Sequence, residues 1–296
     1  MTEHPDYNAP AALKAFMEQH GMAMQKKFGQ NFMVNPAART RIAGLLELDS
    51  GARVWEIGPG LGCMTDEMLR SGADVTAFEI DRGFIALLGQ FFEDYARQDR
   101  FRIVEGDVLR TWRHELERQP EIPAADIRLF GNLPYNIAAT FIADTITRNL
   151  TFARCVFTVQ KEVAQRMAAA PSTEQYSAFS VLCQWLYDVK LSMELAPGNF
   201  WPRPKVSSQA VLLTPKQHPA RCTMPPLFVK TVHALFSQRR KTLLNNIKPL
   251  LPKDSDADGI FRQAGLDKSE RAENLCVAQF VALTEALHEA AQSAKP

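Results

Sequence analysis

The sequence predicts an α/β fold, in which a mostly parallel sheet with an antiparallel edge is followed by a small all-helical domain. The first observation is that apolar runs of about five residues alternate with helix-length segments from residue 53 onward, the pattern of βαβ units. The second is that only helical patterns follow residue 218. A chain of 296 residues can hold one large domain and a smaller one. We expect these domains at residues 1–216 and 217–296.

The apolar runs give the elements in order. We expect parallel strands at residues 54–57, 75–80, 101–104, 127–130 and 155–159, with helices at 65–71 and 84–97 between the first three. A Pro-rich segment joins two further runs, 189–196 and 208–214, which we expect to pair antiparallel at the sheet edge. The helical patterns of the second domain cover 227–236, 240–251, 257–264 and 275–291.

Composition excludes several classes of protein. Hydrophobic residues make up 46% and charged residues 23%, values typical of globular domains. No apolar run approaches about 18 residues, and the N-terminus has no basic-then-apolar signal, so we expect a cytoplasmic protein without a membrane partner. The five cysteines and six histidines are dispersed, so we expect neither disulfides nor a metal site.

Charge is distributed unevenly along the chain. Residues 1–196 hold 20 Lys/Arg and 25 Asp/Glu, whereas residues 197–296 hold 14 and 8. Between Glu194 and Asp254 ten side chains are basic and none is acidic. A one-sign stretch of this length favours a nucleic-acid partner, although a chance fluctuation neutralised by the acidic N-terminal part is the plain alternative.

A glycine-rich loop follows the first strand, from Glu56 through Gly58 and Gly60 to Gly62. Glycines allow a sharp turn and a close approach of a ligand, but a purely structural turn is nearly as common. Because Cys63 stands where a dinucleotide fingerprint has its third glycine, the pattern does not fit that class. An acid before the loop would repel a pyrophosphate and suits a cationic cofactor.

Two further acids close the next two strands. Glu79 is placed to accept hydrogen bonds from ribose hydroxyls, and Asp107 could accept from an adenine amino group. Either acid alone could be a helix N-cap, and for an isolated Asp that is the better explanation. Three such strand ends together favour S-adenosylmethionine (SAM) as the cofactor.

The fourth strand ends in a turn formed by Asn132, Leu133, Pro134 and Tyr135. A plain proline turn is one interpretation. The other is a site for an exocyclic base amine, whose N–H groups would be accepted by the Asn132 side chain and a main-chain carbonyl while the base stacks on Tyr135.

A second aromatic stands in the Pro-rich segment. Phe200 either is buried in a stiffened hairpin loop or clamps the other face of the base, while Arg203 and Lys205 contact phosphates.

These residues together resemble the KsgA/Dim family of ribosomal RNA adenine N6,N6-dimethyltransferases, from residue 26 to about 287. The motifs that carry the resemblance are K-F-G-Q-N-F at 27–32, the glycine loop, N-L-P-Y at 132–135, F-x-P-x-P-x-V-x-S from 200, F-S-Q-R-R-K-T at 236–242 and R-A-E-N at 271–274. The resemblance implies a class I SAM-dependent methyltransferase fold with cofactor contacts at Asn31, Met33, Gly58, Glu79 and Asp107. It further implies that Asn132–Tyr135 and Phe200 hold the adenine.

The implied activity is SAM-dependent dimethylation of two adjacent adenosines in a hairpin loop near the 3′ end of small-subunit ribosomal RNA, during ribosome assembly. We expect a monomer acting on an immature small subunit. RNA contacts are expected at Arg239, Arg240 and Lys241, with Lys26 and Lys27 as a further basic patch. An Erm-like enzyme acting on large-subunit RNA and a non-enzymatic assembly factor on the same fold are the alternatives.

Overall fold

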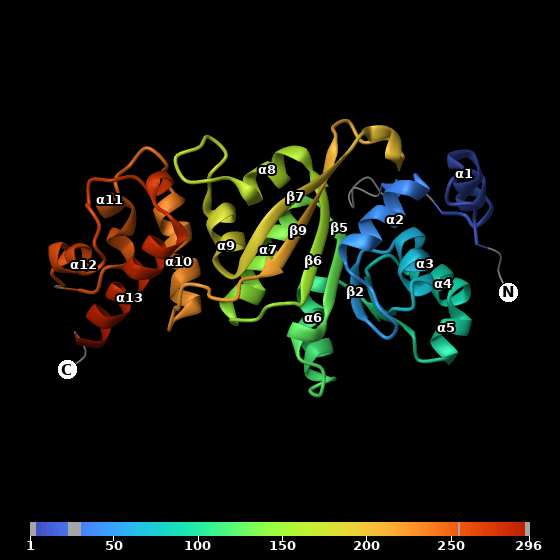
Figure 1. Ribbon diagram of the computed structural model, residues 1–296, viewed down its shortest axis with the longest axis horizontal. Coiled ribbons are helices and arrows are strands. Elements are labelled where there is room, and N and C mark those ends of the chain that lie inside the picture. Colours follow the sequence, from blue (N-terminus) through green and yellow to red (C-terminus); the bar gives the residue numbers. More distant parts are fainter. Residues whose placement is uncertain (1–3, 23–30, 254, 294–296) are drawn as a thin grey trace. The chain divides into compact units, whose positions relative to one another are not determined.

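The computed structural model describes residues 4–22, 31–253 and 255–293, apart from the side chain of Tyr135. Its main sheet has seven strands in the order β4-β3-β2-β5-β6-β9-β7 (Figure 1). These strands are β2 (Arg53–Ile57), β3 (Asp74–Glu79), β4 (Phe101–Glu105), β5 (Arg128–Asn132), β6 (Arg154–Gln160), β7 (Tyr187–Leu195) and β9 (Ser208–Pro215). Strands β2 to β6 pair in parallel and β9 runs antiparallel to β6, so the predicted fold class is confirmed.

The order of the strands places a binding site. The chain enters the middle of the sheet at β2, moves outward through β3 and β4, and then returns to the other side of β2 with β5 and β6. The connections after β2 and β5 therefore leave in opposite directions. In open α/β sheets, ligands bind at the carboxyl ends of the strands beside such a reversal.

Short polar residues start several of the helices around this sheet. The Asn35, Asp81 and Asp107 side chains accept main-chain N–H bonds at the starts of α2, α4 and α6. The helices up to the last strands are α1 (Pro10–Gln19), α2 (Pro36–Leu45), α3 (Cys63–Arg70), α4 (Arg82–Phe91), α5 (Glu93–Arg97), α6 (Val108–Glu117), α7 (Tyr135–Thr147), α8 (Lys161–Ala168) and α9 (Ala178–Leu186). The single helix expected over 84–97 is interrupted at Phe92, whose fully buried ring lies 5.0 Å from that of Phe101.

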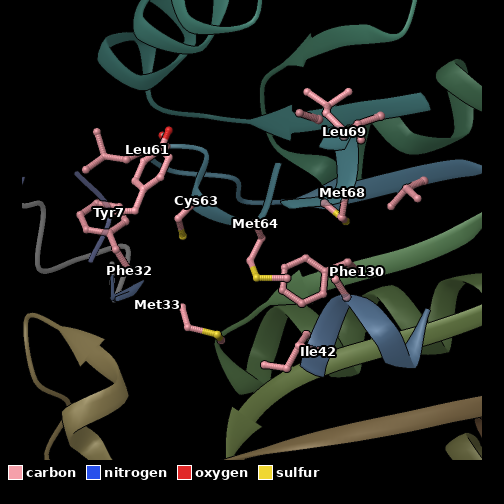
Figure 2. Packing of buried hydrophobic residues seen from close by; sticks show 14 of the residues in the cluster. Tyr7, Phe32, Met33, Ile42, Leu61, Cys63, Met64, Met68, Leu69 and Phe130 are labelled. Carbon is pink, nitrogen blue, oxygen red and sulfur yellow. The ribbon is translucent and has the colours of Figure 1, made fainter. Parts of the chain in front are cut away.

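A second, two-stranded sheet joins the N-terminal motif to the Pro-rich segment. Strand β1 (Phe32–Met33) pairs antiparallel with β8 (Phe200–Trp201), with Met33 opposite Phe200. The core of this part of the molecule includes Phe32, Met33, Leu61 and Cys63, and Figure 2 shows Phe32, Leu61 and Cys63 around the ring of Tyr7. The N-terminal segment, the glycine loop and β1 thus share one apolar core.

The C-terminal helices pack against one another and against α9 through buried apolar side chains. They are α10 (Pro225–Phe236), α11 (Leu243–Ile247), α12 (Ala257–Gln263) and α13 (Val277–Ser293). The helix expected over 240–251 is shorter because the side chain of Thr242 caps α11, and a 3-10 turn follows from Lys248 to Leu250. Within the described residues, no helix is both long and apolar enough to span a membrane.

The chain divides into two compact units that are not continuous in sequence. The first holds residues 1–138, 152–164 and 191–213, and the second holds 139–151, 165–190 and 214–296. Helix α9 belongs to the second unit, where the rings of Trp185 and Phe228 lie 4.3 Å apart. The domains predicted from the sequence, at 1–216 and 217–296, are continuous ranges and stay a prediction.

Candidate active site

A cavity of about 540 Å³ lies in the first unit, at the carboxyl ends of β2, β3, β4 and β5. All the residues predicted to contact a cofactor line it, together with two of those predicted to hold the target. They are Asn31, Met33, Glu56, Gly58, Gly60, Glu79, Asp107, Asn132 and Leu133. The parallel register is the cause, since it brings the end of every strand to the same edge.

The two central glycines of the loop have different reasons to be glycine. Both have positive φ, +71° at Gly58 and +58° at Gly60. A Cβ at Gly60 would lie 2.7 Å from the ring of Phe32, so the loop packs directly on β1. A Cβ at Gly58 would meet no atom within 4 Å, so this position leaves open space beside the loop for a ligand.

Glu79 is held by main-chain donors. One carboxylate oxygen accepts from Ile80 N at 2.8 Å and from Asp81 N at 2.9 Å, and the other accepts from Gly60 N at 3.1 Å. Burial raises the pKa of this carboxyl, and the three N–H bonds oppose that rise. A carboxylate offers about four acceptor positions. In this arrangement one remains, on Oε2, for a ligand hydroxyl.

Glu56 is the buried acid before the glycine loop. The residue is 1% exposed, and its carboxyl accepts a hydrogen bond from Thr65 Oγ1 at 2.5 Å. Burial raises the pKa of Glu56 to about 8; the Thr65 bond opposes the rise and the charge of Glu79 adds to it. The cavity therefore contains a buried acid that a cationic ligand would help to ionise.

Asp107 is both a helix N-cap and a residue of the cavity wall, the two roles that the sequence left open. Its Oδ1 caps α6 by accepting from Leu109 N at 3.0 Å, and the residue also lines the cavity. The cap fixes the side chain.

The Asn132 side chain is fixed at both ends. Its Nδ2 donates to the main-chain oxygen of Asn31 at 2.9 Å, and its Oδ1 accepts from Thr158 Oγ1 at 2.7 Å. The first of these bonds joins the turn after β5 to the segment before β1. Residues 31 and 132 therefore meet in one wall of the cavity.

Sequence reasoning missed part of the lining. Apolar side chains flank the acids, and they include Phe32, Phe78, Ile80, Phe84 and Val108. Ile80 is 48% exposed although it is a large aliphatic residue. The available signal was that an apolar residue directly follows each acid, at Ile80 after Glu79 and at Val108 after Asp107. Apolar side chains placed beside the acids, such as Ile80 and Val108, can enclose a flat aromatic ligand.

Some predicted residues lie elsewhere or outside the described part. Phe200 is only 3% exposed, belongs to the hydrophobic core and does not line the cavity. Stacking on a base would require its ring to turn out of the core, so that role stays a prediction. The side chain of Tyr135 and residues Lys26 and Lys27 lie outside the described residues.

The predicted RNA-contacting residues differ in their surroundings. Arg203 and Lys205 are exposed on the segment after β8. Arg240 and Lys241 are also exposed, in the second unit. Arg239 is exposed as well, but its guanidinium bonds Glu273 at 2.5 Å and the main-chain oxygens of Glu174 and Thr173 at 2.8 and 3.2 Å. It therefore ties two segments of the second unit together.

The donor set of the cavity fits a cationic nucleoside-like ligand. The buried carboxyls of Glu56 and Glu79 provide negative charge, and Gly58 leaves open space. The apolar side chains beside them form a slot for a flat ring. Within residues 4–22, 31–253 and 255–293, no group of three or more His, Cys, Asp or Glu residues is arranged to hold a metal ion.

Comparisons with known proteins agree with this geometry. The family model described as "Ribosomal RNA adenine dimethylase" matches residues 21–289. The chain is 43% identical over 286 residues to "Ribosomal RNA small subunit methyltransferase A" of Treponema denticola, covering 95% of each chain. It is 34% identical over 283 residues to the protein of the same name from Borreliella burgdorferi, covering 96% of this chain and 95% of the relative.

Solved structures show the same fold. A dimethyladenosine transferase from Plasmodium falciparum superposes with a TM-score of 0.70 at 22% identity, covering 86% of this chain and 96% of that one. The 23S rRNA methyltransferase ErmE gives 0.59 at 21% identity, covering 86% and 98%. At these identities the likeness concerns the fold alone.

Proposed function

The chain belongs to the ribosomal RNA adenine dimethylase family, and on that premise we propose that it transfers methyl groups from SAM to N6 of two adjacent adenosines in small-subunit ribosomal RNA. The family makes it an RNA-modifying enzyme. Its relatives are named for the small subunit, which supports small-subunit ribosomal RNA as the substrate. A hairpin loop near the 3′ end of this 16S-type RNA is the target site in the proposal. A monomer in the cytoplasm, acting on an immature small subunit, is part of the same proposal.

One observation carries this proposal. Asn132, the residue suited to a target amine, lines the same cavity as Glu56, Gly58, Glu79 and Asp107, the residues suited to the cofactor. Transfer of a group between two ligands needs both to be held in one space with their reacting atoms aligned. A cavity with both kinds of wall supplies that arrangement.

SAM, when bound, supplies an electrophilic methyl group next to a positive sulfur. Glu79 and Asp107 would bind its nucleoside part, and the ionised Glu56 would balance its positive charge. Gly58 leaves the space that the cofactor would enter.

The target amine is held by the turn after β5. An exocyclic amine is a weak nucleophile because its lone pair is delocalised into the ring. Asn132 Oδ1 would accept a hydrogen bond from one N–H group of the amine. This bond would turn the lone pair of the amine nitrogen towards the methyl group. The main chain at Leu133 would help to hold the amine, and the rings of Tyr135 and Phe200 would stack on the base. When the nitrogen takes the methyl group, the bond from that group to sulfur would break and the cofactor would leave as a neutral thioether. The methylated nitrogen is cationic and acidic, so its proton can pass to water. Positioning and electrostatics therefore suffice, and no strong general base is needed.

A single experiment tests the substrate and the reaction. Small subunits from a strain lacking this activity are incubated with the protein and labelled SAM, and modified nucleotides are mapped by mass spectrometry. We expect two neighbouring N6,N6-dimethyladenosines near the 3′ end of the small-subunit RNA. Already methylated subunits serve as the control and should take up no label. Label in large-subunit RNA would favour the Erm-like activity, and RNA binding without label would favour an assembly factor.

A further inference from the structure

Thr158 lies directly beside Asn132 in the sheet. The two residues are paired in register on β6 and β5, and the Thr158 hydroxyl donates to Asn132 Oδ1 at 2.7 Å. Thr158 is completely buried. Its main-chain oxygen also accepts from Leu133 N at 3.1 Å. One residue of β6 therefore bonds both the side chain and the following main chain of the turn that carries Asn132.

The second partner of Asn132 sets which way its amide points. The main-chain oxygen of Asn31 can only accept, so the amide nitrogen must face Asn31, at 2.9 Å. The amide oxygen must then face Thr158. An amide oxygen has two acceptor positions, and the Thr158 hydroxyl occupies one of them. Because a β-branched side chain has few accessible rotamers in a strand, this hydroxyl is itself held in place.

We propose that Thr158 is a positioning residue for methyl transfer: its hydroxyl holds Asn132 Oδ1 so that the one remaining acceptor position is presented to the target amine. The inference rests on the proposed function, in which Oδ1 accepts an amine N–H. Thr158 itself lies behind Asn132 and does not line the cavity. It acts on the reaction only through the Asn132 amide.

Thr158→Val and Thr158→Ser separate this role from a packing role. Valine keeps the branched shape and the strand preference but has no hydroxyl, whereas serine keeps the hydroxyl and loses the methyl group. Thr284→Val is the matched control, because Thr284 is another fully buried threonine whose hydroxyl bonds a main-chain oxygen, in α13 of the second unit.

The test compares kcat, KM for unmodified small subunits and calorimetric Kd for SAM in the wild type and the three variants. We expect Thr158→Val to lower kcat about tenfold, the effect of one lost orienting hydrogen bond, with KM and Kd changed less than about twofold. Thr158→Ser should restore most of kcat, and Thr284→Val should resemble the wild type. Equal kcat in Thr158→Val and wild type, or equal losses in Thr158→Val and Thr158→Ser, would overturn the proposal.

A second measurement does not depend on activity. The side-chain amide resonances of Asn132, assigned in ¹⁵N-labelled protein without substrate, should shift in Thr158→Val and return towards the wild-type position in Thr158→Ser. Unchanged resonances in Thr158→Val would contradict the positioning role. Failure of the wild type to methylate small subunits would instead overturn the proposed function, while these resonances would still decide how the amide is held.

Discussion

The main-chain N–H of Gly60 donates to the carboxylate of Glu79 at 3.1 Å, and this bond joins the glycine loop after β2 to the end of β3. Two features that are 19 residues apart in sequence therefore form one wall of the cavity. The glycine loop and the acid are a single structure, and a change in one is expected to alter the other.

Glu79→Gln tests this wall. Three N–H donors surround the carboxylate, so a glutamine must turn its own NH2 group towards at least one of them. We expect SAM affinity to fall at least about tenfold and the free energy of unfolding to fall by about 1–3 kcal/mol. Calorimetry and urea unfolding measure both. Asp81→Asn is the control because asparagine can still cap α4; if the two variants behave alike, Glu79 has no special role.

Glu56→Gln tests the buried acid. The pKa of Glu56 is raised by burial from 4.5 to about 8, so the folded protein holds a proton here that the unfolded chain releases above pH 4.5. The free energy of unfolding should therefore fall as pH rises from 4.5 to about 8. Glutamine can still accept from Thr65 but does not titrate, so that decline should become shallower in the variant. Urea unfolding at several pH values measures it, and parallel curves would contradict the assignment.

The same acid predicts a pH dependence of cofactor binding. A positively charged ligand favours the ionised form of Glu56, so binding should release a proton below pH 8. SAM affinity of the wild type should therefore rise between pH 6 and about 8, and that rise should be smaller in Glu56→Gln. Calorimetry in buffers of different ionisation enthalpy counts the released protons. Equal proton release in both proteins would exclude Glu56 as the source.

Tyr7→Phe tests the N-terminal segment. The Tyr7 hydroxyl donates to the main-chain oxygen of Leu61 in the glycine loop at 2.9 Å, and its ring is buried. Losing that bond should lower the free energy of unfolding by about 1 kcal/mol and weaken SAM binding a few-fold, because the loop is less firmly held. Tyr95→Phe, which alters another tyrosine of the same unit, should leave binding unchanged. Unaltered SAM affinity in Tyr7→Phe would mean that the segment does not support the loop.

The basic residues of the second unit should separate into two groups. Replacing exposed Arg240 and Lys241 with Ala should flatten the dependence of RNA affinity on salt, by about 0.7 in log–log slope for each lost phosphate contact. Arg239→Ala should instead lower stability, because its side chain holds Glu273 and two main-chain oxygens. Filter binding over a salt series and thermal unfolding distinguish the two. An unchanged slope in the double variant would place the RNA contact elsewhere.

Much of the fold and of the cavity wall could be predicted because the information is local. Each parallel strand is a short apolar run, and the carboxyl ends of β2, β3, β4 and β5 are marked by a glycine, an acid or an asparagine. Parallel pairing then brings Gly58, Glu79, Asp107 and Asn132 together without further information.

The remainder depends on contacts between distant segments. Strands β1 and β8 are two residues long, and nothing within Phe32–Met33 or Phe200–Trp201 indicates that they pair. Their pairing accounts for the burial of Phe200. Thr158 stands in an apolar run and looks like an ordinary strand residue, so only the register with Asn132 shows its hydrogen bond.

The most direct measurement is single-turnover methyl transfer by Asn132→Ala, together with its calorimetric Kd for SAM. Asn132 lines the cofactor cavity, yet its assigned task concerns the amine that receives the methyl group. We expect the transfer rate to fall by about two orders of magnitude or more, the effect of removing one well-placed group, while Kd changes less than about threefold. A transfer rate equal to that of the wild type would show that Asn132 does not orient the target adenine.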